Sequence, residues 1–273
     1  MAETGSWFGY TGSDGYALRA LRFSPVGQVR GRILMLHGIQ SHAGWYGATC
    51  QALSQAGYEV VFADRRGSGL HEVGRGDTPN WWQIVDDAQA ARTAAWGDTP
   101  CVVVGISWGA KIALALAKRH PANIQAVSLW APGLCPAVKV SFRERARICL
   151  TRVFRPTTLV PIPLNDPALF TASEQWRSFL REDPLALHEA AARFMVESVR
   201  LDTWLAVRKW DLPVLVLLAG QEKIVDNART RAWADRRLRK KQIIEYPAAY
   251  HTLEFEADTT WRDHFLAWLG NVK

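Results

Sequence analysis

Short, almost wholly apolar runs alternate along the chain with longer segments that carry apolar residues at helical spacing. The runs at 33–37 (ILMLH), 60–64 (VVFAD) and 102–107 (VVVGIS) are rich in aliphatic and β-branched residues, as strands buried on both faces of a parallel sheet are. Further strands are predicted at 126–131, 213–219 and 242–247, and helices at 44–57, 81–97, 110–119, 227–241 and 258–269. This order predicts right-handed βαβ crossovers and an α/β fold with a mostly parallel, doubly wound sheet.

Two segments depart from this alternation. At 9–25, Asp14-Gly15 separates two partly alternating stretches, which predicts a β-hairpin with a tight turn. Between 136 and 205 no buried-strand run appears, and a Pro-rich stretch is flanked by helical segments. We interpret 136–205 as a cap inserted between two parts of one core, at 1–135 and 206–273.

One helix of this insertion is predicted to be amphipathic, and two interpretations of it are open: it packs on the core, or it lines an apolar substrate tunnel. Its apolar face carries Phe142, Ala146, Cys149, Leu150 and Val153, and Arg143, Glu144 and Arg147 point away from that face.

The composition fits one large soluble α/β domain. Of 273 residues, 48% are hydrophobic, which suffices for a substantial core. The sequence has neither an apolar run of the roughly 20 residues that cross a bilayer nor the basic-then-apolar order of a signal peptide, so a cytoplasmic location is expected. The four cysteines lack metal-ligand spacing. They are expected to be reduced, buried thiols, with neither a metal site nor a disulfide framework.

The net charge of +7 is concentrated in two segments. Residues 139–155 contain six basic residues and one acidic residue, and residues 226–241 contain seven basic and two acidic residues. These are interpreted as solvated faces, with contact with a membrane surface as the alternative. Neither segment interleaves aromatic and basic residues in the pattern that stacks nucleic-acid bases, so nucleic acid is not an expected partner.

A candidate nucleophile stands where the strand at 102–107 ends. Gly105-Ile106-Ser107-Trp108-Gly109 has the Gly-x-Ser-x-Gly pattern, in which the glycines permit a sharp strand-to-helix turn and the serine hydroxyl is exposed above the sheet. The five-residue pattern is common, but at a junction between a buried strand and a helix it favours a nucleophile over a plain turn.

A serine hydroxyl needs a histidine base that a carboxylate orients. His251 follows the predicted strand at 242–247 and is therefore expected at the same sheet edge as Ser107. His37 and His42 precede the nucleophile and are interpreted as structural or substrate-contacting. His264 lies inside the last predicted helix, where packing or surface exposure is the simpler interpretation.

The carboxylate is expected in the loop after the strand at 213–219, which contains Glu222 and Asp226. Glu222 lies closer to the strand end and is favoured; the alternative for Asp226 is an N-cap of the following helix. The oxyanion of the tetrahedral intermediate needs two backbone amides, and those of Ile39 and Trp108 are expected to supply them. Such a site requires no cofactor.

With these residues in place, the chain from about residue 30 onwards resembles the monoacylglycerol lipase and lysophospholipase branch of the α/β-hydrolases. LHGIQSHAGWY looks like the oxyanion loop of that family, ADRRGSG like its Asp-x-Arg-Gly-x-Gly loop, GQEKIVD like its acid loop and YHTLEFE like its histidine segment. Two departures are Glu222, where an aspartate is more usual, and the bulky Trp108. The resemblance implies that 136–205 is the family's cap over an acyl pocket, which Trp108 would narrow or redirect.

The resemblance implies a serine hydrolase that cleaves carboxylic esters with an apolar acyl chain, such as a monoacylglycerol or lysophospholipid. A small-molecule ester or lipid is then the expected partner, and the basic cap helix suggests peripheral contact with lipid interfaces. A thioesterase, a peptidase or an acyltransferase on the same scaffold is the first alternative. A non-catalytic binding protein is the second, although it would have no need for a serine, a histidine and an acid together.

Overall fold

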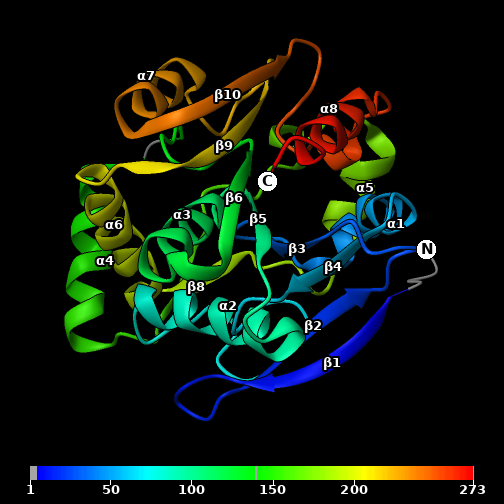
Figure 1. Ribbon diagram of the computed structural model, residues 1–273. Helices are drawn as coiled ribbons and strands as arrows, with labels where there is room; N and C mark the ends of the chain where they lie inside the picture. The colour runs from blue at the N-terminus through cyan, green and yellow to red at the C-terminus, as the bar shows by residue number, and fades with distance from the viewer. Residues whose placement is uncertain (1–4, 139, 273) are drawn as a thin grey trace.

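The computed structural model describes residues 5–138 and 140–272. Within these residues an eight-stranded sheet has the strand order β1-β2-β4-β3-β5-β6-β9-β10 (Figure 1). Its first two strands, β1 (Ser6–Thr11) and β2 (Ala17–Phe23), form the predicted antiparallel hairpin, and β2 is antiparallel to β4 (Tyr58–Ala63). The remaining pairs are parallel, as predicted. Across the sheet, β4 pairs with β3 (Gly31–Leu36), β3 with β5 (Cys101–Ile106), and β5 with β6 (Ile124–Trp130). β6 then pairs with β9 (Trp210–Ala219), and β9 with β10 (Leu238–Tyr246).

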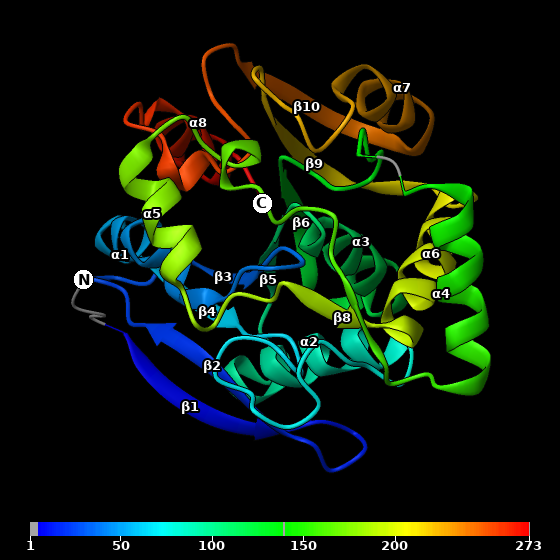
Figure 2. The same ribbon diagram turned by 180° about the vertical axis from the view of Figure 1, so that it is seen from behind.

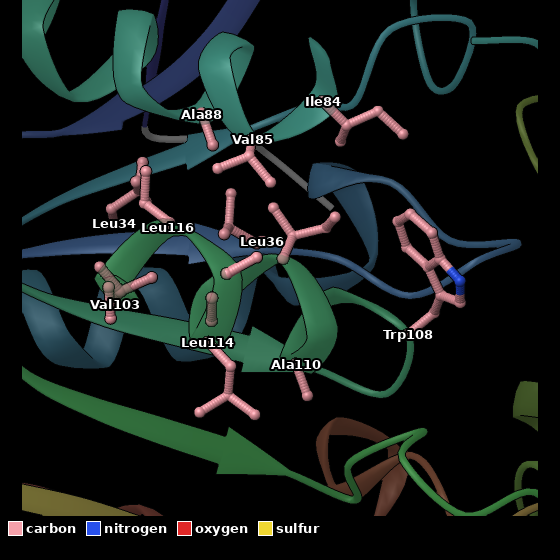
Figure 3. Packing of buried hydrophobic residues seen from close by; sticks show 14 of the residues in the cluster. Leu34, Leu36, Ile84, Val85, Ala88, Val103, Trp108, Ala110, Leu114 and Leu116 are labelled. Carbon is pink, nitrogen blue, oxygen red and sulfur yellow. The ribbon is translucent and has the colours of Figure 1, made fainter. Parts of the chain in front are cut away.

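Helices cover both faces of the sheet, because its central strands are apolar on both sides. One face packs against α2 (Trp81–Trp96), α3 (Gly109–Arg119), α6 (Ala192–Ala206) and α7 (Asn227–Arg237). The other packs against α1 (Gly47–Gln55) and α8 (Thr260–Leu269). Figure 3 shows part of the first layer, where Leu34 and Leu36 of β3 lie among aliphatic side chains of α2 and α3.

One predicted boundary is wrong. The helix expected at 227–241 ends at Arg237, and β10 starts at Leu238. Leu238 is buried and pairs with Trp210, which begins β9. The three basic residues that follow Leu238 suit either a helix surface or an exposed edge strand, so their polarity alone does not distinguish the two.

The segment between β6 and β9 departs from the βαβ alternation, and we call residues 136–205 the cap. It contains α4 (Phe142–Phe154), β7 (Leu159–Pro161), α5 (Glu174–Glu182), β8 (Glu189–Ala191) and α6. β7 and β8 pair as a short antiparallel ribbon. In both ribbon views α4 and α6 lie on one side of the molecule, whereas α5 lies beside α1 and α8 on the other (Figure 2).

The predicted helix in the cap is present as α4, but its apolar face does not pack on the core. Phe142, Leu150 and Val153 are 85%, 62% and 70% exposed, and Ile148 is the buried residue among those described in α4. The helical period identifies an apolar face but not which face a neighbouring element will cover. The cysteines are free thiols, and Cys149 on α4 is exposed rather than buried.

Among the described helices, none combines the length and the apolar content needed to cross a membrane.

Candidate active site

Ser107 lies at the tight turn between β5 and α3. Its φ of 51° falls in the left-handed region, which a residue with a side chain seldom adopts. The Ser107 amide donates to the carbonyl of Trp130 at 2.8 Å, and the Ser107 carbonyl accepts from the Gly133 amide at 2.8 Å. These bonds to the last residue of β6 and to the loop that follows it hold the strained turn in place.

The two glycines that flank the serine are required by close packing. A Cβ at Gly109 would lie 2.3 Å from the carbonyl oxygen of Leu36 in β3, and a Cβ at Gly105 would lie 2.6 Å from Cα of Ala110. Helix α3 therefore starts in direct contact with the backbone of β3. The sequence pattern anticipates this close approach.

The structure brings His251 and Glu222 to Ser107. His251 Nε2 lies 2.9 Å from Ser107 Oγ, and His251 Nδ1 lies 2.7 Å from Glu222 Oε2. The side chains of His251 and Glu222 are each 3% exposed. The three side chains thus form one hydrogen-bonded series that runs from the buried Glu222 and His251 to the partly exposed Ser107 hydroxyl.

Glu222 is held as an ionised carboxylate by its surroundings. Its Oε1 accepts from the backbone amides of Lys223, Ile224 and Val225. Burial raises the pKa of Glu222, but His251 and these amides outweigh burial, and the pKa lies below its ordinary value. Only Oε2 then faces the imidazole.

The other candidates from the sequence have different partners. Asp226 is the N-cap of α7 and accepts from the Arg229 amide at 2.9 Å. His42 Nε2 lies 3.0 Å from Asp183 of the cap. His264 Nδ1 lies 3.0 Å from the hydroxyl oxygen of Tyr246. None of these side chains is hydrogen-bonded to Ser107 in the described part of the chain.

His37 supports the loop that follows β3 through hydrogen bonds to the backbone. Its Nδ1 donates to the Gly38 carbonyl, and its Nε2 accepts from the Arg65 amide at 2.9 Å. Burial lowers the pKa of His37 well below its ordinary value, so the ring is neutral. This arrangement positions the loop rather than the substrate.

The expected oxyanion-hole residues lie on either side of Ser107. Trp108 follows it directly, and the loop with Ile39 approaches so closely that a Cβ at Gly38 would lie 3.7 Å from Ser107 Oγ. Within the described residues neither the Ile39 amide nor the Trp108 amide has a hydrogen-bond acceptor. Both amides are therefore available to a ligand oxygen.

Arg65 is a residue that the sequence reasoning did not single out. Its buried guanidinium donates to the carbonyls of Gly38 and Ile39 at 3.2 and 2.9 Å, and it lies 5.1 Å from the ring centre of Trp108. It therefore contacts both segments that carry the oxyanion-hole candidates. The sequence offered one signal, a second arginine next to that of the Asp-x-Arg-Gly pattern.

A cavity of about 500 Å³ adjoins Ser107 and extends under the cap. Its apolar lining includes Ile148 of α4 and Met195 and Val196 of α6, together with Ile162 and Leu164 between them. The volume falls in the usual range for a small-molecule site. The cap thus supplies much of the wall of the cavity into which Ser107 points.

Trp108 forms part of the cavity floor without blocking it. Its ring packs against Phe194 of α6, with centroids 5.1 Å apart, and its Nε1 donates to Ser198 Oγ at 2.8 Å. Figure 3 shows the indole at the edge of the cluster between α2 and α3, with its nitrogen turned away from the aliphatic side chains. The bulky side chain is accommodated by α6.

A strained serine at a strand-to-helix turn, hydrogen-bonded to a histidine and through it to a carboxylate, defines an α/β-hydrolase of the serine-hydrolase class. Comparison with known proteins agrees. The family described as serine aminopeptidase, S33, matches residues 27–258. The chain belongs to this family of serine hydrolases.

Individual relatives are distant. An uncharacterized abhydrolase domain-containing protein of Dictyostelium discoideum is 26% identical over 82% of the chain, which spans only 24% of that relative. A monoacylglycerol lipase of Mycolicibacterium smegmatis is 24% identical, with 92% of the chain and 91% of the relative covered. Among solved structures, a Paleococcus ferrophilus monoacylglycerol lipase has a TM-score of 0.82 at 21% identity, covering 94% of this chain and 99% of the other.

Proposed function

We propose that this chain hydrolyses carboxylic esters with an apolar acyl chain, of the monoacylglycerol or lysophospholipid type, through an acyl-enzyme on Ser107. The observation that carries the proposal is the hydrogen-bonded series from Ser107 through His251 to Glu222, which opens into an apolar cavity of about 500 Å³. The likeness to a monoacylglycerol lipase of Mycolicibacterium smegmatis supports the substrate class.

In the proposed first step, His251 Nε2 takes the proton of Ser107 Oγ as the oxygen attacks the ester carbonyl carbon. Glu222 keeps the Nδ1 proton of His251 in place and stabilises the imidazolium that forms. The imidazolium then donates its Nε2 proton to the leaving alcohol as the bond from the carbonyl carbon to that oxygen breaks. The acyl group remains on Ser107.

The amides of Ile39 and Trp108 are proposed to donate to the oxyanion of the tetrahedral intermediate. Both are free of other acceptors in the described chain and lie beside Ser107. Because backbone amides are fixed before the reaction starts, their stabilisation of the developing charge costs little reorganisation. In the second half of the reaction, His251 takes a proton from water as the water oxygen attacks the acyl carbon. The imidazolium then returns a proton to Ser107 Oγ as the bond from the acyl carbon to Oγ breaks, and the carboxylic acid leaves.

The apolar lining of the cavity favours an aliphatic acyl chain. Binding is favourable when an alkyl chain displaces water from the isoleucine, leucine, valine and methionine side chains of the cap. The cap is also proposed to contact lipid interfaces. Its helix α4 exposes Phe142, Leu150 and Val153 beside Arg143 and Arg147, a combination suited to an anionic lipid surface.

The family description raises aminopeptidase activity as an alternative. An N-terminal ammonium group needs an unpaired carboxylate near the nucleophile. Among the described residues that line the cavity, the acidic side chain is Asp202, whose Oδ1 lies 2.7 Å from Lys111 Nζ. Lys111 balances the charge of this carboxylate and would repel a second ammonium group, which favours an uncharged acyl chain over a free amino terminus.

The direct experiment measures kcat/KM for p-nitrophenyl octanoate, with alanine p-nitroanilide as the peptidase substrate. Wild type is expected to hydrolyse the ester and to leave the anilide almost untouched, and Ser107→Ala is expected to reduce ester turnover at least about a thousandfold. Unchanged ester hydrolysis by Ser107→Ala, or a clear preference for the anilide, would refute the proposal.

A further inference from the structure

One wall of the cavity beside Ser107 is polar. It is formed by Lys111 of α3 and by Ser198 and Asp202 of α6, all of which line the cavity. Lys111 follows Ser107 by four residues, and its side chain is only 6% exposed. From Gly109 to Ala117 the other residues of α3 are glycine, alanine, isoleucine and leucine. A lysine is therefore buried in a stretch that otherwise serves the core, where lysines are rare unless paired.

The three side chains are connected to one another and to Trp108. Lys111 Nζ lies 2.7 Å from Asp202 Oδ1 and donates to Ser198 Oγ at 3.4 Å. Ser198 Oγ also accepts from Trp108 Nε1 at 2.8 Å. The ion pair thus joins the helix that follows the nucleophile to the cap helix above it.

These contacts leave hydrogen-bonding capacity unused. An ammonium group can donate three hydrogen bonds and a hydroxyl group can donate one. Within the described residues, the Lys111 ammonium has two acceptors, and the Ser198 hydroxyl proton has no acceptor. Asp202 Oδ2 accepts no hydrogen bond from the described residues, and the Asp202 side chain is 35% exposed. The polar wall therefore presents both donors and an acceptor to whatever occupies the cavity.

A hydroxyl group matches this wall better than a carboxylate does. A hydroxyl oxygen accepts from Lys111 or Ser198 while its proton is donated to Asp202. A carboxylate has no proton to donate and would be repelled by Asp202. A plain alkyl chain would leave the unused proton of Lys111, the Ser198 hydroxyl proton and Asp202 Oδ2 without water and without a further partner, which costs free energy.

We propose that Lys111, Ser198 and Asp202 form a subsite for a hydroxyl group on the substrate, so that the enzyme prefers hydroxylated esters to their plain alkyl counterparts. This inference rests on the proposed ester hydrolysis by Ser107 and deepens it. The hydroxyl belongs either to the acyl chain or to the alcohol, and the two sources need separate substrate pairs. Lys111 is then a specificity-determining residue, distinct from the groups that act on the ester bond.

The test compares kcat/KM within two matched pairs of substrates. For the acyl side, p-nitrophenyl octanoate is compared with p-nitrophenyl hydroxyoctanoates that carry the hydroxyl at successive carbons. For the alcohol side, propyl octanoate is compared with 1-octanoylglycerol. Wild type is expected to prefer the hydroxylated member by about tenfold in one pair, the size of one net hydrogen bond to a charged group.

Lys111→Met keeps the length of the side chain and removes its charge and its protons. It is expected to bring the ratio of kcat/KM between the hydroxylated and the plain ester close to one, whatever its effect on turnover of the plain ester. Lys118→Met makes the same change on the exposed end of α3, outside the cavity, and should keep the wild-type preference. A purely structural role of the ion pair would lower the melting temperature of Lys111→Met without changing the ratio between the paired substrates.

The outcomes separate the subsite from the proposed function. Absence of preference in wild type, or a preference that survives in Lys111→Met, overturns the subsite while Ser107-dependent hydrolysis of p-nitrophenyl octanoate stands. Absence of that hydrolysis overturns the proposed function itself. Should Lys111→Met fail to fold, Ser198→Ala removes a single hydroxyl and is expected to reduce the preference several-fold; an unchanged ratio in Ser198→Ala also overturns the subsite.

Discussion

Arg65 joins the two segments that carry the proposed oxyanion-hole amides. Its guanidinium donates to the carbonyls of Gly38 and Ile39 and stacks on the ring of Trp108. Burial lowers the pKa of Arg65 to about 9, so the side chain stays charged at neutral pH. We interpret Arg65 as a positioning residue, because it touches the backbone that would hold the oxyanion and not the ester itself.

Replacing Arg65 should therefore affect kcat more than KM. Arg65→Met removes the charged donors to both carbonyls, and hydrogen bonds to charged groups are worth about 1.5–3 kcal/mol each. We expect kcat for p-nitrophenyl octanoate to fall by about tenfold or more with a small change in KM, and Arg65→Lys to restore part of the loss. A variant that changes KM alone would contradict a role in orienting the oxyanion loop.

Asp64 gives the fold a pH dependence. It is buried, and burial raises its pKa to about 6, whereas an unfolded aspartate has a pKa of about 3.9. Between about pH 4 and pH 6 the folded state therefore binds more protons than the unfolded state does. The free energy of unfolding must fall as the pH rises through this window, by about 3 kcal/mol from this group.

Asp64→Asn should remove that contribution. An asparagine oxygen still accepts from the Ala43 amide, which donates to Asp64 at 2.8 Å, but the side chain no longer titrates. Urea unfolding at intervals between pH 4 and pH 7 is expected to show the variant gaining stability relative to wild type as the pH rises. A constant difference across this range would mean that Asp64 titrates normally.

At the scale of elements, the contact between β3 and the start of α3 fixes the serine turn. Gly109→Ala would place a methyl group 2.3 Å from the Leu36 carbonyl, and neither backbone can yield without moving Ser107. Overpacking of this kind costs about 1–3 kcal/mol or more. We expect loss of both stability and ester turnover, measured by urea unfolding and kcat.

Gly47→Ala is the matched control for that substitution. Gly47 is the first residue of α1, has a φ of −58°, and a Cβ there meets nothing within 4 Å. Alanine in such a position stabilises a protein by about 0.5–1 kcal/mol. Equal effects of the two substitutions would show that close packing at Gly109 is not the cause.

Helix α4 is the element on which the proposed interfacial contact depends. Phe142 and Val153 lie on its exposed apolar face, and replacing both with serine removes the side chains that would enter a lipid surface. Turnover of a micellar or anionic-vesicle substrate is expected to fall several-fold, while turnover of monomeric p-nitrophenyl butyrate stays constant.

The control for α4 is Val207→Ser. Val207 is 70% exposed and follows the C-terminal end of α6, so its loss should leave micellar turnover unchanged. Equal turnover of micellar and monomeric substrate by wild type would contradict interfacial contact altogether.

Across the whole molecule, the strands and helices of the α/β core could be predicted from the sequence because local patterns define them. Buried parallel strands such as β5 are apolar on both faces, and the turn at Ser107 requires glycines at fixed positions. The sequence predicted Ser107, His251 and Glu222 as site residues because each follows a recognisable strand. Parallel strands end at the same edge of the sheet, so residues that follow them lie close together. The cytoplasmic location stays a prediction.

The cap was less predictable because its contacts are tertiary. The period of α4 gave an apolar face, but which face α6 covers depends on residues far away in the chain, and Ile148 rather than Phe142 is buried. The positions of Arg65 and Lys111 beside the site were not predicted, for the same reason. Each is a charged residue whose partners lie in other segments, at Ile39 for Arg65 and at Asp202 for Lys111.

The central claim is that Ser107 is a nucleophile activated by His251 and Glu222. Its most direct test is reaction of the protein with a fluorophosphonate probe, followed by mass spectrometry of the labelled peptide. We expect one label on Ser107 of wild type, with labelling slowed by a competing octanoyl ester and absent from Ser107→Ala. An unlabelled wild type, or a label on another residue that persists in Ser107→Ala, would contradict it.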